Sequence, residues 1–269
     1  MRLSEIFAPV SKQKGFTLVE LFFAMSLVSL MTVFLLAILN TTSQIWCNNE
    51  EKIGSYREVR AALTFMTQEL SSIYTGKFFK TRSFVINPEV TTVRQTDIAM
   101  NKDWASRLFF LATIPGKGQL PEANRSDLCA VGYFLAYTLD LTAYREKNTP
   151  DTVGSYKLYR FFRSSDPTFQ ILSGNDLVTP LFEANPGVNA EVLAIGITRF
   201  TTKAYVNGKG GLLAWNAALD KSRPDLIELS LTAIGLHHCA RLRSKKEWED
   251  HTSEFHRNYG RTFTTRVHL

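Results

Sequence analysis

The chain is poor in cysteine and lacks the sequence motifs of common enzymes. It has three cysteines, Cys47, Cys129 and Cys239, so it can form only one intramolecular disulfide bond. It contains no Gly-x-Ser-x-Gly nucleophile motif, no phosphate-binding loop, no His-Glu-x-x-His zinc motif and no dinucleotide fingerprint. We therefore expect neither enzymatic activity nor a bound cofactor.

The N-terminal part also lacks charge and proline over long stretches. No charged residue falls within Leu21–Leu39 and no proline within Phe16–Tyr74. At about 1.5 Å per residue, an uncharged helix of this length crosses a hydrocarbon core of about 30 Å. Arg2, Lys12 and Lys14 precede the apolar run. The positive-inside rule then predicts that the chain beyond the run faces an oxidising compartment.

The apolar run opens with Gly15-Phe16-Thr17-Leu18-Val19-Glu20. A lipid-facing carboxylate such as Glu20 costs at least ~2.5–3.5 kcal/mol, so it needs a partner. The sextet resembles the prepilin processing signal of type IV pilins and type II secretion pseudopilins. This resemblance implies cleavage after Gly15 by an inner-membrane prepilin peptidase and N-methylation of Phe16. It also implies that Glu20 compensates the N-terminal amine of a neighbouring subunit during filament assembly.

The resemblance also implies a location and partners. The protein would be a single-pass inner-membrane protein with its C-terminal domain in the periplasm, or outside the cell once in a filament. Its partners would be other minor and major pilins or pseudopilins. The alternative for the N-terminal segment is an ordinary signal anchor, which explains the apolar run but not the order of the sextet.

Beyond the membrane-length segment, an apolar stripe with helical spacing predicts that the helix continues. The helix is expected from Phe16 to about Tyr74. The resulting division is a leader at 1–15, a membrane half of the helix at 16–40, an amphipathic half at 41–75 and a periplasmic domain at 76–269. The stripe consists of Ile45, Trp46, Ile53, Tyr56, Val59, Leu63, Met66, Leu70 and Ile73.

The rest of the chain is predicted to form antiparallel β-strands. Short β-rich runs alternate with turn residues, and the glycine-rich segment 207–211 is read as a hairpin turn. A helix followed by strands indicates an α+β fold, with a long N-terminal helix packed on an antiparallel β-sheet domain. The expected strands are Lys77–Asn87, Ser106–Ile114, Leu128–Thr138, Lys157–Arg163, Leu193–Thr202, Leu226–Ile234 and Arg261–Leu269.

The strand region carries a weaker resemblance to particular pilin-like proteins. GYFLAY, LYRFF, LAIGITRF and RPDLIELSLTAI are similar to the minor pseudopilins of the J class and to PilW-type minor pilins. SQIW and YREVRAALTFMTQELS resemble the pilin-like proteins of the Verru_Chthon cassette most of all. The membrane helix lacks the proline usual in major pilins, and no C-terminal disulfide loop is present. The resemblance therefore implies a minor subunit at the tip of a type II secretion pseudopilus or a type IV pilus-like filament.

Other features left alternatives open. Either Cys129 and Cys239 form a disulfide bond or all three cysteines stay unpaired.

The histidines at 237–238 and 251–256 lack the spacing of a metal site, so we expect no metal, and a short helix or hairpin suits 248–256 better. Trp104, Trp215 and Trp248 are expected to pack in the core rather than mark a binding face. The basic segment 241–269 is the only support for a DNA- or ligand-binding minor pilin, so nucleic acid is not an expected partner.

Overall fold

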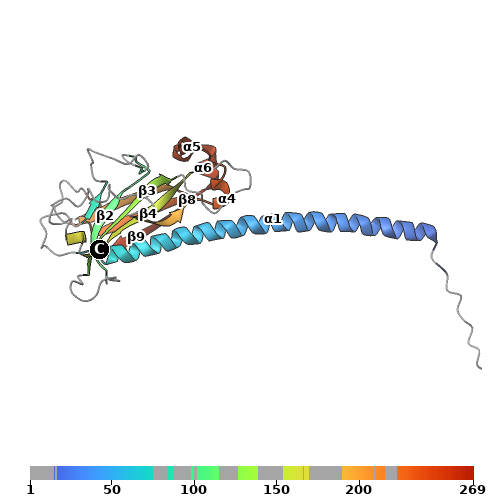
Figure 1. Ribbon diagram of the computed structural model, residues 1–269, viewed down its shortest axis with the longest axis horizontal. Helices are drawn as coiled ribbons and strands as arrows, with labels where there is room; N and C mark the ends of the chain where they lie inside the picture. The colour runs from blue at the N-terminus through green and yellow to red at the C-terminus, as the bar shows by residue number, and fades with distance from the viewer. Residues whose placement is uncertain are drawn as a thin grey trace, which may run out of the picture. The chain divides into compact units, whose positions relative to one another are not determined.

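The structure is a computed structural model with two compact units, Met1–Asn49 and Glu50–Leu269. It describes residues 15, 17–74, 84–87, 98–99, 102–114, 127–138, 154–165, 167–169, 190–208, 210–215 and 223–269, except for the side chains of residues 47–52, 55 and 237. Residues 1–14 of the predicted leader 1–15 lie outside the described residues, as does Phe16. The expected α+β class is confirmed, because a long apolar N-terminal helix precedes antiparallel strands (Figure 1).

Helix α1 spans Leu18–Ser71. It ends a few residues before the predicted Tyr74 because the backbone there joins a sheet. The amide of Tyr74 donates to the Leu111 carbonyl at 2.8 Å, and the amide of Thr113 donates to the Ser72 carbonyl at 2.8 Å. These bonds satisfy the backbone outside the helix and fix the point where the helix ends.

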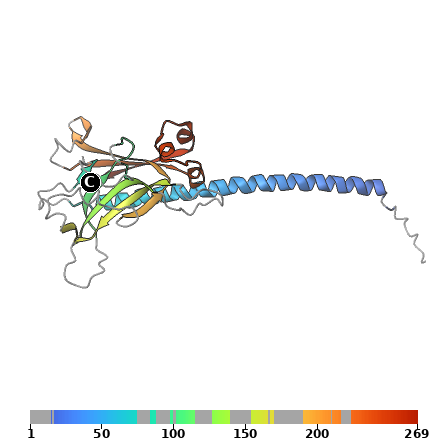
Figure 2. The ribbon, with the colours of Figure 1, turned by 45° about the horizontal axis from the view of Figure 1, so that its top comes forward.

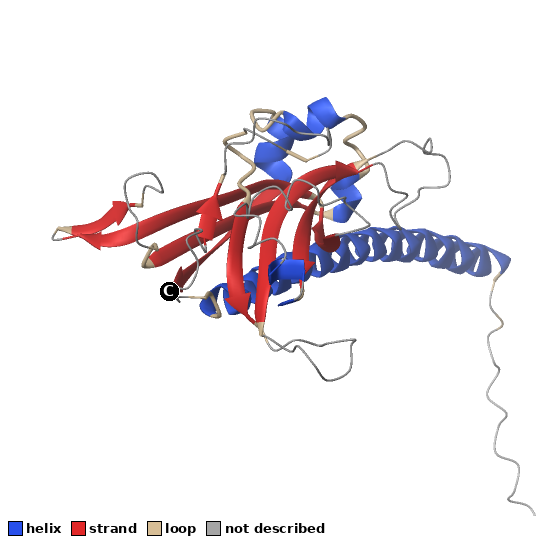
Figure 3. Ribbon diagram, turned by 60° about the vertical axis from the view of Figure 1, so that its left-hand side comes forward, coloured by secondary structure: helices blue, strands red, loops and turns tan. Residues whose placement is uncertain are grey.

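The strands of Glu50–Leu269 form two antiparallel sheets rather than the single sheet expected (Figure 3). The first has the order β1-β2-β3-β4-β5 and the second β7-β6-β8-β9. The first contains β1 (Phe84–Ile86), β2 (Leu108–Thr113), β3 (Leu128–Thr138), β4 (Ser155–Arg163) and β5 (Ala190–Ile195). The second contains β6 (Ile197–Gly208), β7 (Gly211–Ala214), β8 (Leu226–Ile234) and β9 (Gly260–His268).

The division into two sheets occurs at Gly196. One strand was predicted over Leu193–Thr202, but the backbone at Gly196 has a φ of 74° and interrupts it. β5 therefore pairs with β4, and β6 pairs with β8. An added Cβ at Gly196 would lie 2.8 Å from the Cys239 Sγ and 2.9 Å from the Ile234 carbonyl oxygen. Both the left-handed backbone and the lack of space explain why glycine stands there.

The main core lies between the C-terminal part of α1 and both sheets. It includes the predicted stripe from Val59 onward, whereas Ile45, Trp46 and Ile53 are exposed. The amphipathic stripe is thus shorter than expected. Each fully buried large side chain contributes about 1.5–3 kcal/mol. The helix residues of this core are Val59, Ala62, Leu63, Met66 and Leu70, and Ile73 follows them just beyond the end of the helix.

The first sheet is buried on both faces, and the second sheet on one. A separate core cluster covers the face of the first sheet that carries Phe109, Phe134 and Tyr159. Burial on both faces explains why β3 reads as a continuous apolar run, while β8 alternates between buried and half-buried positions.

Candidate functional site

The start of α1 is the candidate functional site. Thr17 precedes the first helical residue, and the amide of Leu21 donates to its carbonyl at 3.2 Å. The Glu20 Oε2 atom accepts hydrogen bonds from the Thr17 main-chain N–H and from the Thr17 Oγ1, both at 2.9 Å. In return, the Glu20 amide donates to the Thr17 Oγ1 at 3.3 Å. This reciprocal pattern is a capping box, which satisfies amides that the first turn leaves without helical partners.

The capping box gives Glu20 a partner within its own chain. The prepilin resemblance implies a partner for Glu20 in a neighbouring subunit. The local partner, Thr17, was not predicted, although the spacing Thr17-x-x-Glu20 is a capping signal. Both hydrogen bonds end on Oε2; among the described residues, Oε1 accepts none. The carboxylate therefore keeps one oxygen for a donor that its own helix start does not supply.

The segment Leu18–Trp46 is long and apolar enough to cross a membrane, and none of it is buried in the folded chain. Its hydroxyl groups are compatible with lipid, because they bond back to the helix. Ser26 donates to the Phe23 carbonyl, and Ser29 to the Met25 carbonyl, each at 2.8 Å. Thr32 and Thr41 make the same kind of bond. Such internal bonds remove the cost of leaving a polar group unpaired in hydrocarbon.

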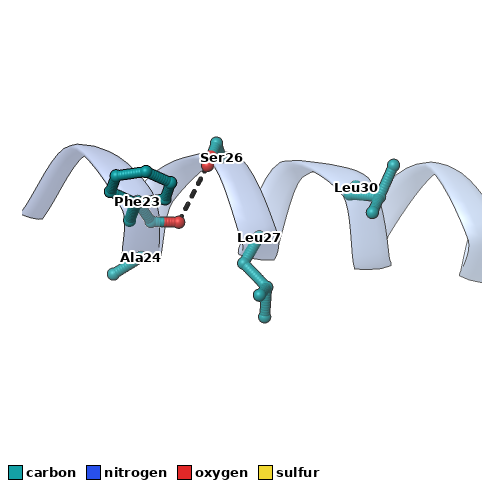
Figure 4. Close-up of a pocket in the computed structure, with 5 residues that line it drawn as sticks. All are labelled: Phe23, Ala24, Ser26, Leu27 and Leu30. Atoms are coloured by element: carbon teal, nitrogen blue, oxygen red, sulfur yellow. Dashed lines mark hydrogen bonds between the residues drawn. The ribbon is translucent and has the colours of Figure 1, made fainter. Parts of the chain in front are cut away.

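A hollow lies on one side of this segment (Figure 4). It is lined by Phe23, Ala24, Ser26, Leu27 and Leu30. Figure 4 also shows the bond from Ser26 to the Phe23 carbonyl, which turns the hydroxyl back toward the helix. The lining is therefore almost wholly apolar, which suits an acyl chain or an apolar side chain of another helix.

The C-terminal part of α1 is fixed to the first sheet by a buried ion pair. Arg160 of β4 pairs with Glu69 of α1 through two nitrogens, one of them Nε at 3.1 Å from Oε2. Tyr133 of β3 donates its hydroxyl to the same carboxylate, and Arg160 also pairs with Glu191 of β5. Burial, followed by the charge of Glu69, raises the pKa of Tyr133. Burial, the largest single effect, would lower the pKa of Arg160, but the hydrogen bonds and charges of Glu69, Glu191 and Tyr133 together raise it.

Sequence reasoning did not foresee this ion pair. Glu69 is not part of the predicted apolar stripe, yet its side chain is only 7% exposed and that of Arg160 only 11%. A buried charge pair of this kind mainly fixes geometry, because breaking it leaves one charge unpaired. It sets how the end of α1 lies on the sheet within this unit.

Of the two alternatives for Cys129 and Cys239, the structure has the unpaired one. Both thiols are free and buried. The Cys129 Sγ donates to the Ile114 carbonyl at 3.8 Å, and the Cys239 Sγ donates to the Ile234 carbonyl at 3.5 Å. The two cysteines belong to different elements, strand β3 and helix α4 (Leu236–Cys239), and each thiol contacts the backbone near its own element. The fold therefore does not bring the two sulfur atoms together.

The remaining candidate clusters are accounted for by packing. Among the described residues, no group of three His, Cys, Asp or Glu side chains can hold a metal ion.

Trp248 is fully buried, and Trp104 and Trp215 pack against the same core. In the basic segment, Arg241 lies over the rings of Phe255 and Tyr259, and Arg266 pairs with Glu228 at 2.9 Å. These contacts give no support to a nucleic-acid surface.

No protein-family model matches this chain, and no curated protein and no solved structure matches it either.

Proposed function

We propose that this chain is a minor pilin-like subunit that is cleaved after Gly15 and assembles through its N-terminal helix into an inner-membrane filament. The observation that carries the proposal is the order Gly15-Phe16-Thr17-Leu18-Val19-Glu20 directly before an uncharged run. A plain signal anchor needs the run alone. The filament would be a type II secretion pseudopilus or a type IV pilus-like fibre, with this subunit at its tip.

The exposed apolar surface of α1 supports this proposal. Within Leu18–Trp46 the large apolar side chains lie on all sides of the helix, and Trp46 is 70% exposed. A helix that is apolar all round needs lipid or other helices around it. In the proposed filament, neighbouring subunits would replace lipid around this segment. The exposed Ile45 and Ile53 would extend the contact toward the domain.

Glu20 supports the same assembly step. Its Oε2 is held by Thr17, which positions the carboxylate at the start of the helix. We propose that Oε1 receives the amine of a neighbouring subunit's Phe16 after cleavage. A charge-assisted bond of this kind would offset part of the cost of a carboxylate in lipid.

The test is processing of the full chain in a membrane. The protein is co-expressed with a prepilin peptidase, extracted in detergent and examined by intact mass and N-terminal sequencing. We expect a mature chain that begins at methylated Phe16, and we expect Gly15→Asp to abolish it. Gly54→Asp is the matched control, because a side chain at Gly54 meets nothing within 4 Å. That variant should be processed normally.

An uncut chain would overturn the proposal. It would leave a single-pass membrane-anchored protein unrelated to filaments. Cleavage after the apolar run would also contradict it and would indicate a secreted domain. If processing occurs, cross-linking between Leu27→Cys chains, whose cysteine lies at an exposed position of the apolar run and leaves Glu20 intact, and co-expressed pilins then tests assembly itself.

A further inference from the structure

The connection between β8 and β9 is a helical lobe where a tight turn would have sufficed. Ile234 and Gly260 are paired across the two strands, yet residues 235–259 lie between them. They form α4 (Leu236–Cys239), α5 (Lys245–Glu249) and α6 (Glu254–Tyr259), grouped beside one end of the strands (Figure 2). A hairpin needs only about two to five residues. The lobe can therefore move without breaking the pairing of β8 with β9.

The first half of the lobe is held by apolar packing. Leu242 and Trp248 are buried in the main core, and the Trp248 ring lies 6.4 Å from that of Tyr156 in β4. Glu249 strengthens this attachment. It accepts a hydrogen bond from the Tyr156 hydroxyl at 2.7 Å and lies 3.7 Å from the Lys102 Nζ.

The second half is held by two histidines and by two apolar rings. Phe255 and Tyr259 pack against the main core and against His238 of α4, with the His238 and Tyr259 ring centroids 4.1 Å apart.

The His251 ring packs edge-on against Trp104 with centroids 4.8 Å apart, and against His256 with centroids 5.4 Å apart. His256 is 8% exposed, and its Nδ1 lies 2.8 Å from the Ser253 Oγ. Two imidazoles in contact cannot both be charged at low cost.

Burial favours the neutral forms of both rings, and the charged groups around them act in both directions. Arg199 of β6 repels a protonated His251, as does a protonated His256. Asp250 and Glu249 attract it, but Glu249 is already engaged by Tyr156 and Lys102, and Asp250 accepts from the Thr252 hydroxyl at 2.6 Å. Burial is the largest effect, and the net result of burial and these charges is a His251 pKa of about 4. Burial also lowers the pKa of His256, although the charge of Asp250 and a hydrogen bond with the Trp248 backbone act in the opposite direction.

We propose that the lobe is an acid-released cover, in which protonation of His251 and His256 detaches residues 251–259 from Trp104 and uncovers the side of the Trp104 ring on which His251 packs. The attachment is complete above the ordinary imidazole pKa of about 6.5. It weakens as the pH falls from there to about 4, the pKa of attached His251. The opening constant rises at most about tenfold per pH unit for each proton taken up. The proposal does not depend on filament assembly.

The test is amide hydrogen exchange of the full chain in detergent, corrected for the intrinsic pH dependence of exchange. Below about pH 5, between the free and attached imidazole values, we expect peptides within 251–259 to lose protection while β8 and β9 keep theirs. His251→Phe keeps a ring against Trp104 but cannot take up a proton. It should lower the pH at which protection is lost, whereas His268→Asn, on an exposed residue at the end of β9, should not.

Two results would overturn the proposal: loss of protection by lobe and sheet together, or the same transition in His251→Phe as in the parent chain. A second measurement does not need a variant. NMR titration of the two imidazoles should give apparent pKa values below about 6.5, and a value at or above it for both would also reject the cover.

Discussion

Thr17 and Glu20 form a closed pair at the start of α1, because each side chain bonds to the main chain of the other. Glu20, the acid of the proposed processing signal, is thus a capping residue of its own helix. Under the proposed function, membrane residence before assembly does not leave Glu20 without a partner. Assembly would then add a donor instead of supplying the only one.

Thr17→Val should fray the first turn of the helix. The variant keeps the size of the side chain but removes the hydroxyl that accepts from the Glu20 amide. Loss of a side-chain cap costs about 1 kcal/mol, so the Glu20 amide should exchange roughly fivefold faster, as measured by NMR in detergent. Thr17→Ser retains the hydroxyl and should exchange like the parent chain. Equal exchange in both variants would show that the cap does not hold this turn.

Arg160→Met should strongly destabilise the domain. It leaves the buried Glu69 carboxylate without its cation, which costs about 3–5 kcal/mol for buried pairs. Chemical unfolding of the detergent-solubilised chain, followed by circular dichroism, measures the loss. The double variant Glu69→Met/Arg160→Met removes both charges and should recover most of it. Arg266→Gln breaks the exposed pair with Glu228 and should cost less than about 1 kcal/mol. A small effect of Arg160→Met would show that the pair does not anchor the helix.

Gly196→Ala should also be destabilising, by at least about 1–3 kcal/mol. The substitution forces a residue with a Cβ into a φ of 74° and places that Cβ against Cys239 and the Ile234 carbonyl. The melting temperature of the full chain measures the effect. In Gly54→Ala, the new Cβ meets nothing and the helix gains propensity, so stability should hold or rise slightly. An unchanged melting temperature in Gly196→Ala would show that the left-handed backbone of Gly196 is not what separates β5 from β6.

The thiols of Cys129 and Cys239 should resist alkylation in the folded protein. Burial raises the pKa of Cys239 to about 12 and also raises the pKa of Cys129. The thiolate, which is the reactive form, is therefore scarce for both at neutral pH. In a Cys47→Ser background, iodoacetamide should label neither residue until denaturant is added, and then both. A reductant should leave the melting temperature unchanged. A lower melting temperature on reduction would point to the bridge between Cys129 and Cys239.

Features that depend on local order could be predicted from the sequence. The uncharged run and the long helix that contains it were predicted to within a few residues, and strands β3 and β8 with their observed bounds, because hydrophobic periodicity and segment length are local properties. The hairpin turn at 207–211 follows from the same local rules, and of the two alternatives for 248–256, a short helix or a hairpin, the structure has parts of two short helices, α5 and α6. The proposed processing signal likewise consists of contiguous residues.

Contacts between residues that are distant in sequence depend on the tertiary structure. Glu69 and Arg160 are far apart in sequence, and nothing in the periodicity of α1 indicates that one of its polar residues is buried against β4. The division into two sheets depends on the backbone of one glycine, whose φ is imposed by the surrounding packing. The free state of Cys129 and Cys239 depends on where their two elements lie. Long-range pairing is set by the shape and charge of the whole core, whereas a sequence window reports only neighbours along the chain.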